Sequence, residues 1–495
     1  MVELPNEIWM QIFELALHDE QLIGHVLPDS TTPCSWFRMI YGNWALRTPS
    51  EQLIVAYGQR YSLLKTVTLT CRNWRQLISE FMFEALCFND LNHFNQFFAL
   101  LERDPTVWKW VRRISIMPFL HANRWDTSET LNTLASILQR CRRIEVLAAD
   151  FPLKASFSPL ADVLCTRARG LRTLRLNVSA KYIKKVILIL ESLSSLSYLH
   201  LEIAGSTSDD VKLGAVSGMA LSFPRLRQLC LHGLIADLVE EACAWDFPSL
   251  EMVSLDFLHH HDLPDLQEFL RSHGALLTFL DIDSTSSMDV ASILELCPNL
   301  QAFAFNLDWR LPSTVSGAAA LVNSPHPNLT FIGCHGLAYA FGVGYLATAA
   351  AYDPFTTRYM RHSNDMNILA LNTRNFPKLK YVRVLSRSLL RDLEAANGPH
   401  STCYDRWARW SNQCAREGIR LEDCTGDELG ALPDDGEDYD EFLEEEEEEY
   451  EYVEEAVEEA LDPISILRRL REECQQAVAN LQVASPAPFY DQAWM

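Results

Sequence analysis

The feature that most constrains the fold of this chain is a short apolar pattern that recurs along its middle. Each copy has apolar residues at its first, fourth and sixth positions. The copies begin at Val111, Ile144, Leu171, Leu196, Leu226, Leu250, Leu277, Leu300, Leu329 and Leu379, and Ile419 and Leu421 form a half copy. Because successive side chains of a strand point to opposite faces, each copy predicts a short strand with one apolar face. A unit of this size cannot bury that face alone, so we expect the copies to stack.

The stretches between the copies carry helical periodicity. From Leu171 onward the steps between copies are 25, 30, 24, 27, 23, 29 and 50 residues. The stretch 181–193 is typical, since its apolar residues recur at the spacing of one helix face. The longest step suggests a repeat that is missed or inserted near residue 350. Alternating strands and helices of this kind predict the α/β class with a parallel sheet.

Over residues 111–421 the pattern resembles a leucine-rich repeat. The Asn that regular repeats carry is missing, because Ser179 and Ala204 stand at its positions. The resemblance therefore implies an irregular solenoid with a concave parallel sheet, which we assign to residues 91–425. The alternative is an ordinary α/β domain with short parallel strands.

The same alternation predicts which side chains the strands present on the open face of the sheet. Aromatic and polar side chains on a rigid surface suit protein recognition, so these residues are candidates for substrate binding. The predicted set is Tyr198, His200, Gln228, His232, Asp256, Asp281, Asp283, Asn306 and Tyr381. The alternative for any one of them is a solvated side chain without a partner.

The N-terminal residues predict two short helices. The first covers Leu4–Leu17, where Pro5 suits a helix start and Glu7 suits the positive end of the helix dipole. The second covers Lys65–Ser79 and has one apolar face. That face is made of Val67, Cys71, Trp74 and Ile78.

These two segments together resemble an F-box. The matching motif runs Leu4-Pro5-x-Glu7-Ile8-x-x-x-Ile12-Phe13 and resumes as Leu69-Thr70-Cys71-Arg72-Asn73-Trp74-Arg75-x-Leu77. It is similar to fungal F-box proteins, in which an insertion separates the two halves. The resemblance implies a helical module that binds the Skp-type adaptor of a cullin ubiquitin ligase. The positions that would contact the adaptor are Leu4, Pro5, Ile8, Ile12, Phe13, Leu69, Cys71, Trp74 and Leu77. The alternative is a helical cap on the solenoid.

Charge is distributed unevenly along the chain. The net charge is −24, but residues 433–495 alone carry −18, whereas residues 103–185 carry +10. A nucleic-acid partner is not expected, because binding phosphates needs clustered Lys and Arg over the protein surface. The basic block is a candidate for binding an acidic segment of a substrate or the acidic tail. The alternative is that its charged side chains form a solvated face.

The cysteines and the apolar runs indicate the compartment. The 13 cysteines are scattered and form no Cys-x-x-Cys pair, so reduced thiols in the cytoplasm or nucleus are expected. No run reaches the ~18 uncharged apolar residues that suggest a membrane span, and no membrane association is expected. The stretch Leu311–Tyr352 has no charged residue, which leaves open a partner surface, a ligand pocket or a buried segment.

No motif of catalysis, cofactor binding or metal binding is visible. The chain lacks a phosphate-binding glycine loop, a Gly-x-Ser-x-Gly elbow and a His-Glu-x-x-His helix. The cluster His259–Asp262 is metal-like in composition, but adjacent histidines do not share one face of a strand or helix. We therefore expect no catalytic, cofactor or metal site, and a chain that is not an enzyme.

The predicted organisation has three parts. Residues 1–90 form an F-box-like module with an insertion at 18–64, residues 91–425 form the solenoid, and residues 426–495 form an acidic tail with a short helix over Ile464–Gln482. The resemblance implies the substrate-recognition subunit of an SCF-type (Skp–cullin–F-box) ubiquitin ligase. Its expected partners are the Skp-type adaptor, the cullin complex and a protein substrate. The alternative is a scaffold or interaction protein without ligase coupling.

Overall fold

The computed structural model of the chain describes residues 4–17, 27–39, 44–117, 128–153, 157–205, 213, 216–257, 266–284, 289–308, 321–344 and 353–430. The chain forms two compact units. The first contains Met1–Trp36 and Ala45–Gly436, and the second joins Phe37–Trp44 to Glu437–Met495. The fold and the sites below belong to the first unit. The His259–Asp262 cluster, the acidic run of the tail and the predicted helix Ile464–Gln482 lie outside the described residues.

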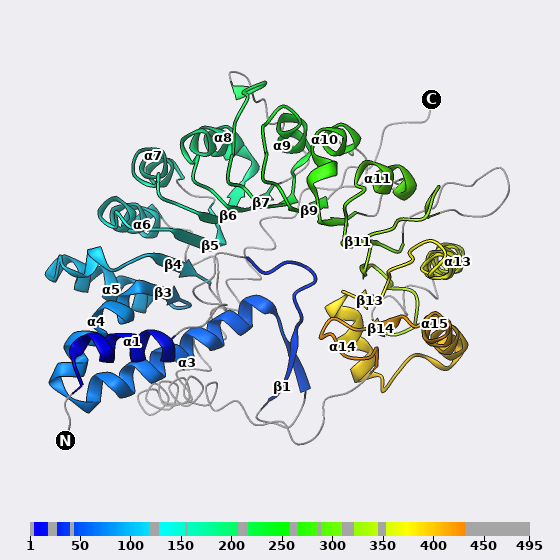
Figure 1. The fold of residues 1–495 in the computed structure, drawn as a ribbon, viewed down its shortest axis with the longest axis horizontal. Helices are drawn as coiled ribbons and strands as arrows, with labels where there is room; N and C mark the ends of the chain where they lie inside the picture. The colour runs from blue at the N-terminus through cyan, green and yellow to red at the C-terminus, as the bar shows by residue number, and fades with distance from the viewer. Residues whose placement is uncertain are drawn as a thin grey trace, which may run out of the picture. The chain divides into compact units, whose positions relative to one another are not determined.

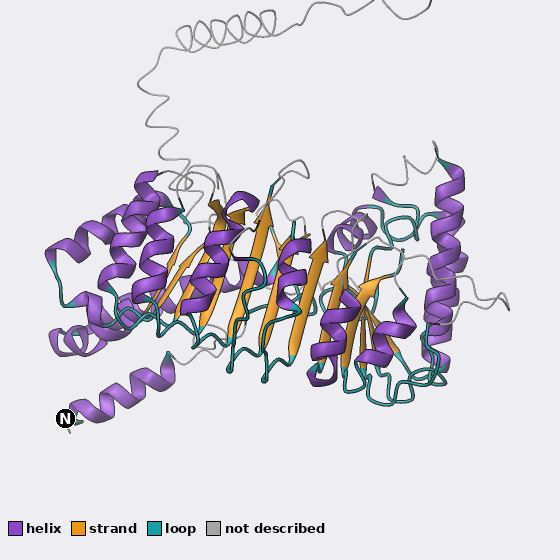
Figure 2. Ribbon diagram, turned by 90° about the horizontal axis from the view of Figure 1, so that it is seen from above, coloured by secondary structure: helices purple, strands orange, loops and turns teal. Residues whose placement is uncertain are grey.

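Twelve parallel strands form one continuous sheet, and each strand pairs with the next one along the chain. Figures 1 and 2 show the strands side by side, with most of the connecting helices on one side of the sheet. The strands are β3 (Ala85–Phe88), β4 (Arg113–Ile116), β5 (Val146–Leu153), β6 (Thr173–Ser179), β7 (Tyr198–Ala204), β8 (Gln228–Gly233), β9 (Met252–Phe257), β10 (Phe279–Asp283), β11 (Ala302–Asn306), β12 (Phe331–His335), β13 (Tyr381–Val384) and β14 (Arg420–Glu422).

Helices precede the sheet and connect most of its strands. The α-helices are α1 (Asn6–Ala16), α3 (Pro49–Thr70), α4 (Arg72–Glu84), α5 (Leu91–Arg103), α6 (Ser128–Arg140), α7 (Ser158–Arg167), α8 (Ile183–Ser192), α9 (Ala236–Ala242), α10 (Leu266–His273), α11 (Val290–Leu296), α13 (Pro354–Ala370), α14 (Arg387–Ala395) and α15 (Tyr404–Arg416). Short 3-10 helices are η1 (Val107–Lys109), η3 (Ala180–Tyr182), η5 (Gly274–Leu276) and η6 (Ser401–Cys403). Two further strands, β1 (Ser35–Arg38) and β2 (Trp44–Arg47), lie between α1 and α3.

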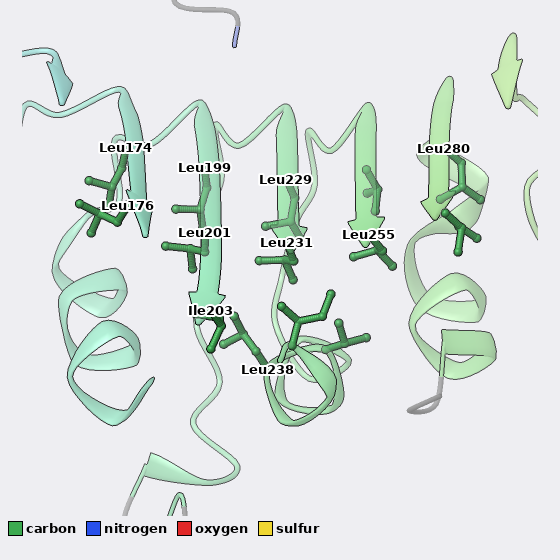
Figure 3. Close-up of a cluster of buried hydrophobic side chains, with 14 of the residues drawn as sticks. Leu174, Leu176, Leu199, Leu201, Ile203, Leu229, Leu231, Leu238, Leu255 and Leu280 are labelled. Carbon is green, nitrogen blue, oxygen red and sulfur yellow. The ribbon is translucent and has the colours of Figure 1, made fainter. Parts of the chain in front are cut away.

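The apolar residues of the repeated pattern form the core between the sheet and its helices. The fourth residue of each copy is paired with the fourth residue of the next, so one row of fully buried side chains crosses eight strands. That row is Leu174, Leu199, Leu229, Val253, Leu280, Phe303, Ile332 and Val382. Figure 3 shows part of it together with Leu238 of α9, which packs from the helix side. Burying each such side chain stabilises the fold by about 1.5–3 kcal/mol.

The α/β class and the parallel sheet are thus confirmed. All the predicted copies of the pattern, including the half copy, fall on strands. The suggestion of a missed repeat near residue 350 is wrong, because β12 pairs directly with β13. The long step between these strands instead contains α13. The strand β3 was not predicted, since four residues between two helices carry too short a pattern to be recognised.

The N-terminal helices differ from the prediction in one respect. The segment Lys65–Ser79 is not one helix, because α3 ends and α4 begins around Cys71. Cys71 has an extended backbone, and its sulfur accepts a hydrogen bond from the amide of Trp74 at 3.4 Å. This cap starts a new helix without shifting the apolar periodicity, which is why the periodicity hides the break. α3 also begins at Pro49, within the predicted insertion, after a capping box between Thr48 and Glu51.

The uncharged stretch Leu311–Tyr352 is described only at 321–344. There it supplies β12 and several fully buried side chains, among them Leu329, Leu337 and Phe341. The buried alternative therefore holds for this part.

Candidate interaction surfaces

The first helix packs one of its faces against α4. Trp9 and Phe13 lie against Trp74, with ring centroids 4.6 and 5.4 Å away, and the Phe13 and Trp74 rings meet edge to face. Phe13 joins Leu64 and Ile78 in a small buried cluster. At the start of both helices, Asn73 Nδ2 donates a hydrogen bond to Asn6 Oδ1 at 3.2 Å. These contacts fix the orientation of α1 about its own axis.

A second face of α1, beside the packed one, is apolar and exposed. Together with Leu4 just before the helix, it presents four residues, spaced by four, four and three positions, whose side chains are between 39% and 78% exposed. We call Leu4, Ile8, Ile12 and Leu15 the exposed stripe. A stripe of large apolar side chains on one helix face is typical of a docking surface.

The predicted adaptor-binding residues therefore divide into two groups. Leu4, Pro5, Ile8, Ile12, Leu69 and Cys71 are exposed, whereas Phe13 is buried and Trp74 and Leu77 are partly buried. The partly buried residues pack against the small core that holds α1 on α4. The side chains of the exposed group are accessible, whereas Phe13 and Trp74 hold α1 against α4.

A second surface is the face of the sheet opposite the helix layer, which we call the inner face. Each predicted substrate-binding residue lies on a strand with its side chain on this face, out of phase with the buried leucines. Gln228, Asp281 and Asn306 are buried. Tyr198, His200, His232, Asp256, Asp283 and Tyr381 are partly buried. Some of these side chains are shielded from solvent by another segment of the same chain.

Part of the inner face is covered by the segment Leu27–Cys34, which we call the strap. The carbonyl oxygen of Leu27 accepts from Gln228 Nε2 on β8 at 3.3 Å. The Ser30 hydroxyl donates to Asp281 on β10 at 2.5 Å, and Arg383 Nη1 on β13 donates to the Thr31 carbonyl oxygen at 2.8 Å. The strap thus crosses from β8 to β13, and Figure 1 shows it in blue before β1, on the inner side of the sheet.

The far end of the strap is also fixed. The amide of Cys34 donates to the carbonyl oxygen of Cys424 at 2.8 Å, just after β14. Cys34, Cys424 and Leu390 are buried together in one small cluster. Within the strap, Asp29 accepts hydrogen bonds from the backbone amide and the hydroxyl of Thr31 at 2.9 and 2.8 Å. This local turn shapes the segment that lies on the sheet.

The buried cluster beneath the strap is charged. His335 Nε2 lies 2.7 Å from Asp281 Oδ1, and its Nδ1 lies 3.4 Å from Asp283 Oδ2. Asp281 also accepts from the Ser254 hydroxyl at 3.0 Å, and Asp283 accepts from Asn306 Nδ2 at 3.1 Å. The two carboxylates of β10 thus share one imidazole from β12, which lies two strands away in the sheet.

Electrostatics decide the protonation of this cluster. Burial acts to lower the pKa of His335, but the charge and the hydrogen bond of Asp281, together with Asp283 and Asp256, raise it to about 9. Burial acts to raise the pKa of Asp281, but His335 and the hydroxyls of Ser30 and Ser254 bring it below the usual range. At neutral pH His335 is therefore a cation paired with an anionic Asp281, and Ser30 ties the strap to that pair.

A second polar group lies on β5–β9 of the inner face. Arg175 Nη2 pairs with Asp150 Oδ2 at 3.0 Å, and the His200 and His232 rings stack with centroids 4.8 Å apart. His232 Nδ1 is 3.5 Å from Asp256 Oδ2. Burial lowers the pKa of His200 well below its ordinary value, and the charge of Arg175 adds to the effect. This stacked imidazole pair offers a flat surface with charged groups on both sides.

The basic block 103–185 does not form one patch. Arg175 pairs with Asp150 on the inner face, and Arg113 is buried on β4. Arg140, at the end of α6, instead stacks over the Trp108 ring at 4.9 Å. Its positive charge is therefore divided between different faces and the interior.

Sequence reasoning missed several inner-face residues that matter. His335 and Arg383 follow the same alternation as the predicted set, six and four residues after the start of their copies, so the pattern could have identified them. The strap carries no periodicity and had no comparable signal.

Neither a protein-family model nor a curated protein sequence matches the chain. Within the described ranges, no group of three or more His, Cys, Asp or Glu side chains is arranged to hold a metal ion. None of the helices that the structure describes has the length and apolar character to cross a membrane.

Proposed function

We propose that this chain is the substrate-recognition subunit of an SCF-type ubiquitin ligase. The observation that carries the proposal is the exposed stripe on α1. Three of its four residues, Leu4, Ile8 and Ile12, are motif positions that the F-box resemblance assigns to adaptor contact. A helix that anchors one face through Phe13 and leaves the other apolar face uncovered suits docking into a groove of a partner.

The inner face supplies the substrate-binding surface in this proposal. The group on β5–β9, with stacked His200 and His232 beside Asp256 and Arg175, combines aromatic area with charge. Such surfaces favour protein recognition. The chain itself would perform no bond chemistry, since holding a substrate lysine near a charged conjugating enzyme raises its effective concentration.

Co-purification with the Skp-type adaptor tests the proposal. Wild-type protein should bind, and the double variant Ile8→Asp, Ile12→Asp should not. Losing the burial of two isoleucines removes about 3–6 kcal/mol, which weakens binding by more than about a hundredfold. The matched control is Leu188→Asp on α8, since Leu188 is similarly exposed at 45% and lies outside the stripe. Failure of the wild type to bind, or equal binding by the double variant, would overturn the proposal.

One observation favours a second candidate, an interaction protein without ligase coupling. Thr70 stands where F-box proteins usually carry Val, and its hydroxyl donates to the Thr66 carbonyl oxygen at 3.1 Å, so this exposed helix end is more polar than the family pattern. This candidate predicts substrate capture by the full-length double variant together with no adaptor binding by the wild type.

A further inference from the structure

A pocket of about 630 Å³ lies between α13, the turn at Gly342 and the segment from His400 to Arg406. The residues that α13 contributes are 354, 357, 358, 361, 362 and 365. Their spacing of three and one places them on a single face of the helix. One helix face thus forms a complete wall of the pocket.

The side chains that line the pocket carry an excess of positive charge. Arg358 and Arg361 come from α13 and Arg406 from α15, whereas Asp365 is the one carboxylate among the lining residues that the structure describes. Asp365 Oδ1 accepts from Arg406 Nε at 3.0 Å and from the Trp410 indole at 2.9 Å. The negative charge is therefore already compensated at one end of the pocket.

The other two arginines have no such ion pair with any residue that the structure describes. Arg361 Nε donates to the Tyr339 carbonyl oxygen at 2.8 Å, and this bond leaves its terminal nitrogens for other partners. In the part of the chain that the structure describes, no carboxylate lies within 4.0 Å of the Arg358 or Arg361 guanidinium. The bordering stretch Leu311–Tyr352 contains no Asp or Glu at all.

Gly342 allows this arrangement. Its φ of +67° lies in the left-handed region, and a Cβ there would come within 3.5 Å of Arg361 Nη2 and 3.1 Å of the His400 Cβ. A side chain at this position would therefore crowd the pocket from the side of the turn.

His400 adds an imidazole donor. Its Nδ1 accepts a hydrogen bond from the backbone amide of Thr402 at 3.3 Å. Because that amide can only donate, the ring donates through Nε2. The pocket therefore has an imidazole N–H as well as guanidinium donors.

We propose that this pocket binds a phosphoryl group. Guanidinium groups match the oxygens of phosphate in paired hydrogen bonds, and they keep their charge at every physiological pH. Two uncompensated arginines with a histidine donor suit a dianionic group better than a single carboxylate. The ligand is a phosphate ester, either of a free small molecule or of a phosphorylated protein segment. The site lies apart from the exposed stripe and the polar groups of the inner face, and does not depend on ligase coupling.

Isothermal titration of the full-length chain tests the site with two probes. The first is inorganic pyrophosphate, and the second is a phosphoserine peptide compared with its unphosphorylated form. The variant is Arg358→Gln, because Arg358 is exposed and its replacement should leave the fold intact. The matched control is Arg416→Gln, an exposed arginine in the last turn of α15 outside the pocket. Circular dichroism of both variants checks folding.

Binding of either probe by wild type and by Arg416→Gln, weakened about tenfold or more in Arg358→Gln, would support the site. Preference for pyrophosphate would identify a free phosphate ester, and preference for the phosphopeptide would identify a protein segment. Absence of binding of both probes to the wild type would overturn the proposal, as would equal affinity of Arg358→Gln and Arg416→Gln.

Discussion

Protonation of His335 should control the stability of the inner face. The imidazole is 13% exposed and pairs with Asp281, whose side chain is 4% exposed, at 2.7 Å. Replacing His335 by Gln keeps a hydrogen-bond donor and removes the charge. Because an unpaired buried carboxylate remains, we expect the free energy of unfolding at pH 6 to fall by about 3–5 kcal/mol.

The pH dependence gives a separate estimate of the same interaction. The pKa of His335 is about 9 in the fold, against an ordinary value of 6.5. A group whose pKa is raised in the folded state stabilises it fully below the unfolded pKa, and that contribution is lost as pH rises through the folded pKa. The pKa difference corresponds to about 3 kcal/mol, which should disappear between about pH 6.5 and pH 9.5.

Urea unfolding followed by tryptophan fluorescence at pH 6.0, 7.5 and 9.5 measures this loss. The difference between wild type and His335→Gln should be largest at pH 6.0 and smallest at pH 9.5. His93→Gln is the control, because His93 is an exposed imidazole on α5 that lies outside the cluster. A difference between wild type and His335→Gln that is equal at all three pH values would refute this account of the cluster.

Two further predictions each compare a pair of matched residues. Arg383→Met should lower the free energy of unfolding by about 3–5 kcal/mol, because Arg383, 14% exposed, pairs at 2.7 Å with buried Glu422 and holds the strap. Arg420→Met should cost less than about 1 kcal/mol in the same urea assay, since Arg420 is 62% exposed and 3.6 Å from that carboxylate; equal losses would contradict this. Gly233→Ala should lower the midpoint of thermal unfolding more than Gly218→Ala. Both glycines have positive φ, but only at Gly233 would the Cβ come within 2.3 Å of a backbone oxygen of the neighbouring strand, so similar midpoints would argue against this geometry.

Much of the sheet could be predicted from the sequence, because burying one face of a strand requires apolar residues at alternate positions and these are visible in the sequence. The row from Leu174 to Val382 is fully buried, so its apolar identity is visible at every copy. The same alternation located Asp281 and His232 on the inner face. It could not show that Asp281 is buried, because the strap that covers it comes from another part of the chain.

The strap was beyond sequence reasoning for a physical reason. It is held by hydrogen bonds and a charged cluster, and these leave no periodic apolar signal. Thr31 and Arg383 are separated by 352 positions, and Ser30 and Asp281 by 251. The break at Cys71 escaped for a related reason, since cysteine is not among the usual capping residues.

The strap also has a consequence for the order in which the protein can be completed during synthesis. A ladder of neighbouring repeats can grow one strand at a time as each leaves the ribosome. The segment around Ser30 and Thr31 emerges before all of that ladder, yet its last partner on the sheet, Arg383, emerges near the end of the described chain. The strap is therefore synthesised before the sheet but fixed only after most of the sheet has formed. A nascent chain still short of β13 presents an inner face that this segment has not yet covered.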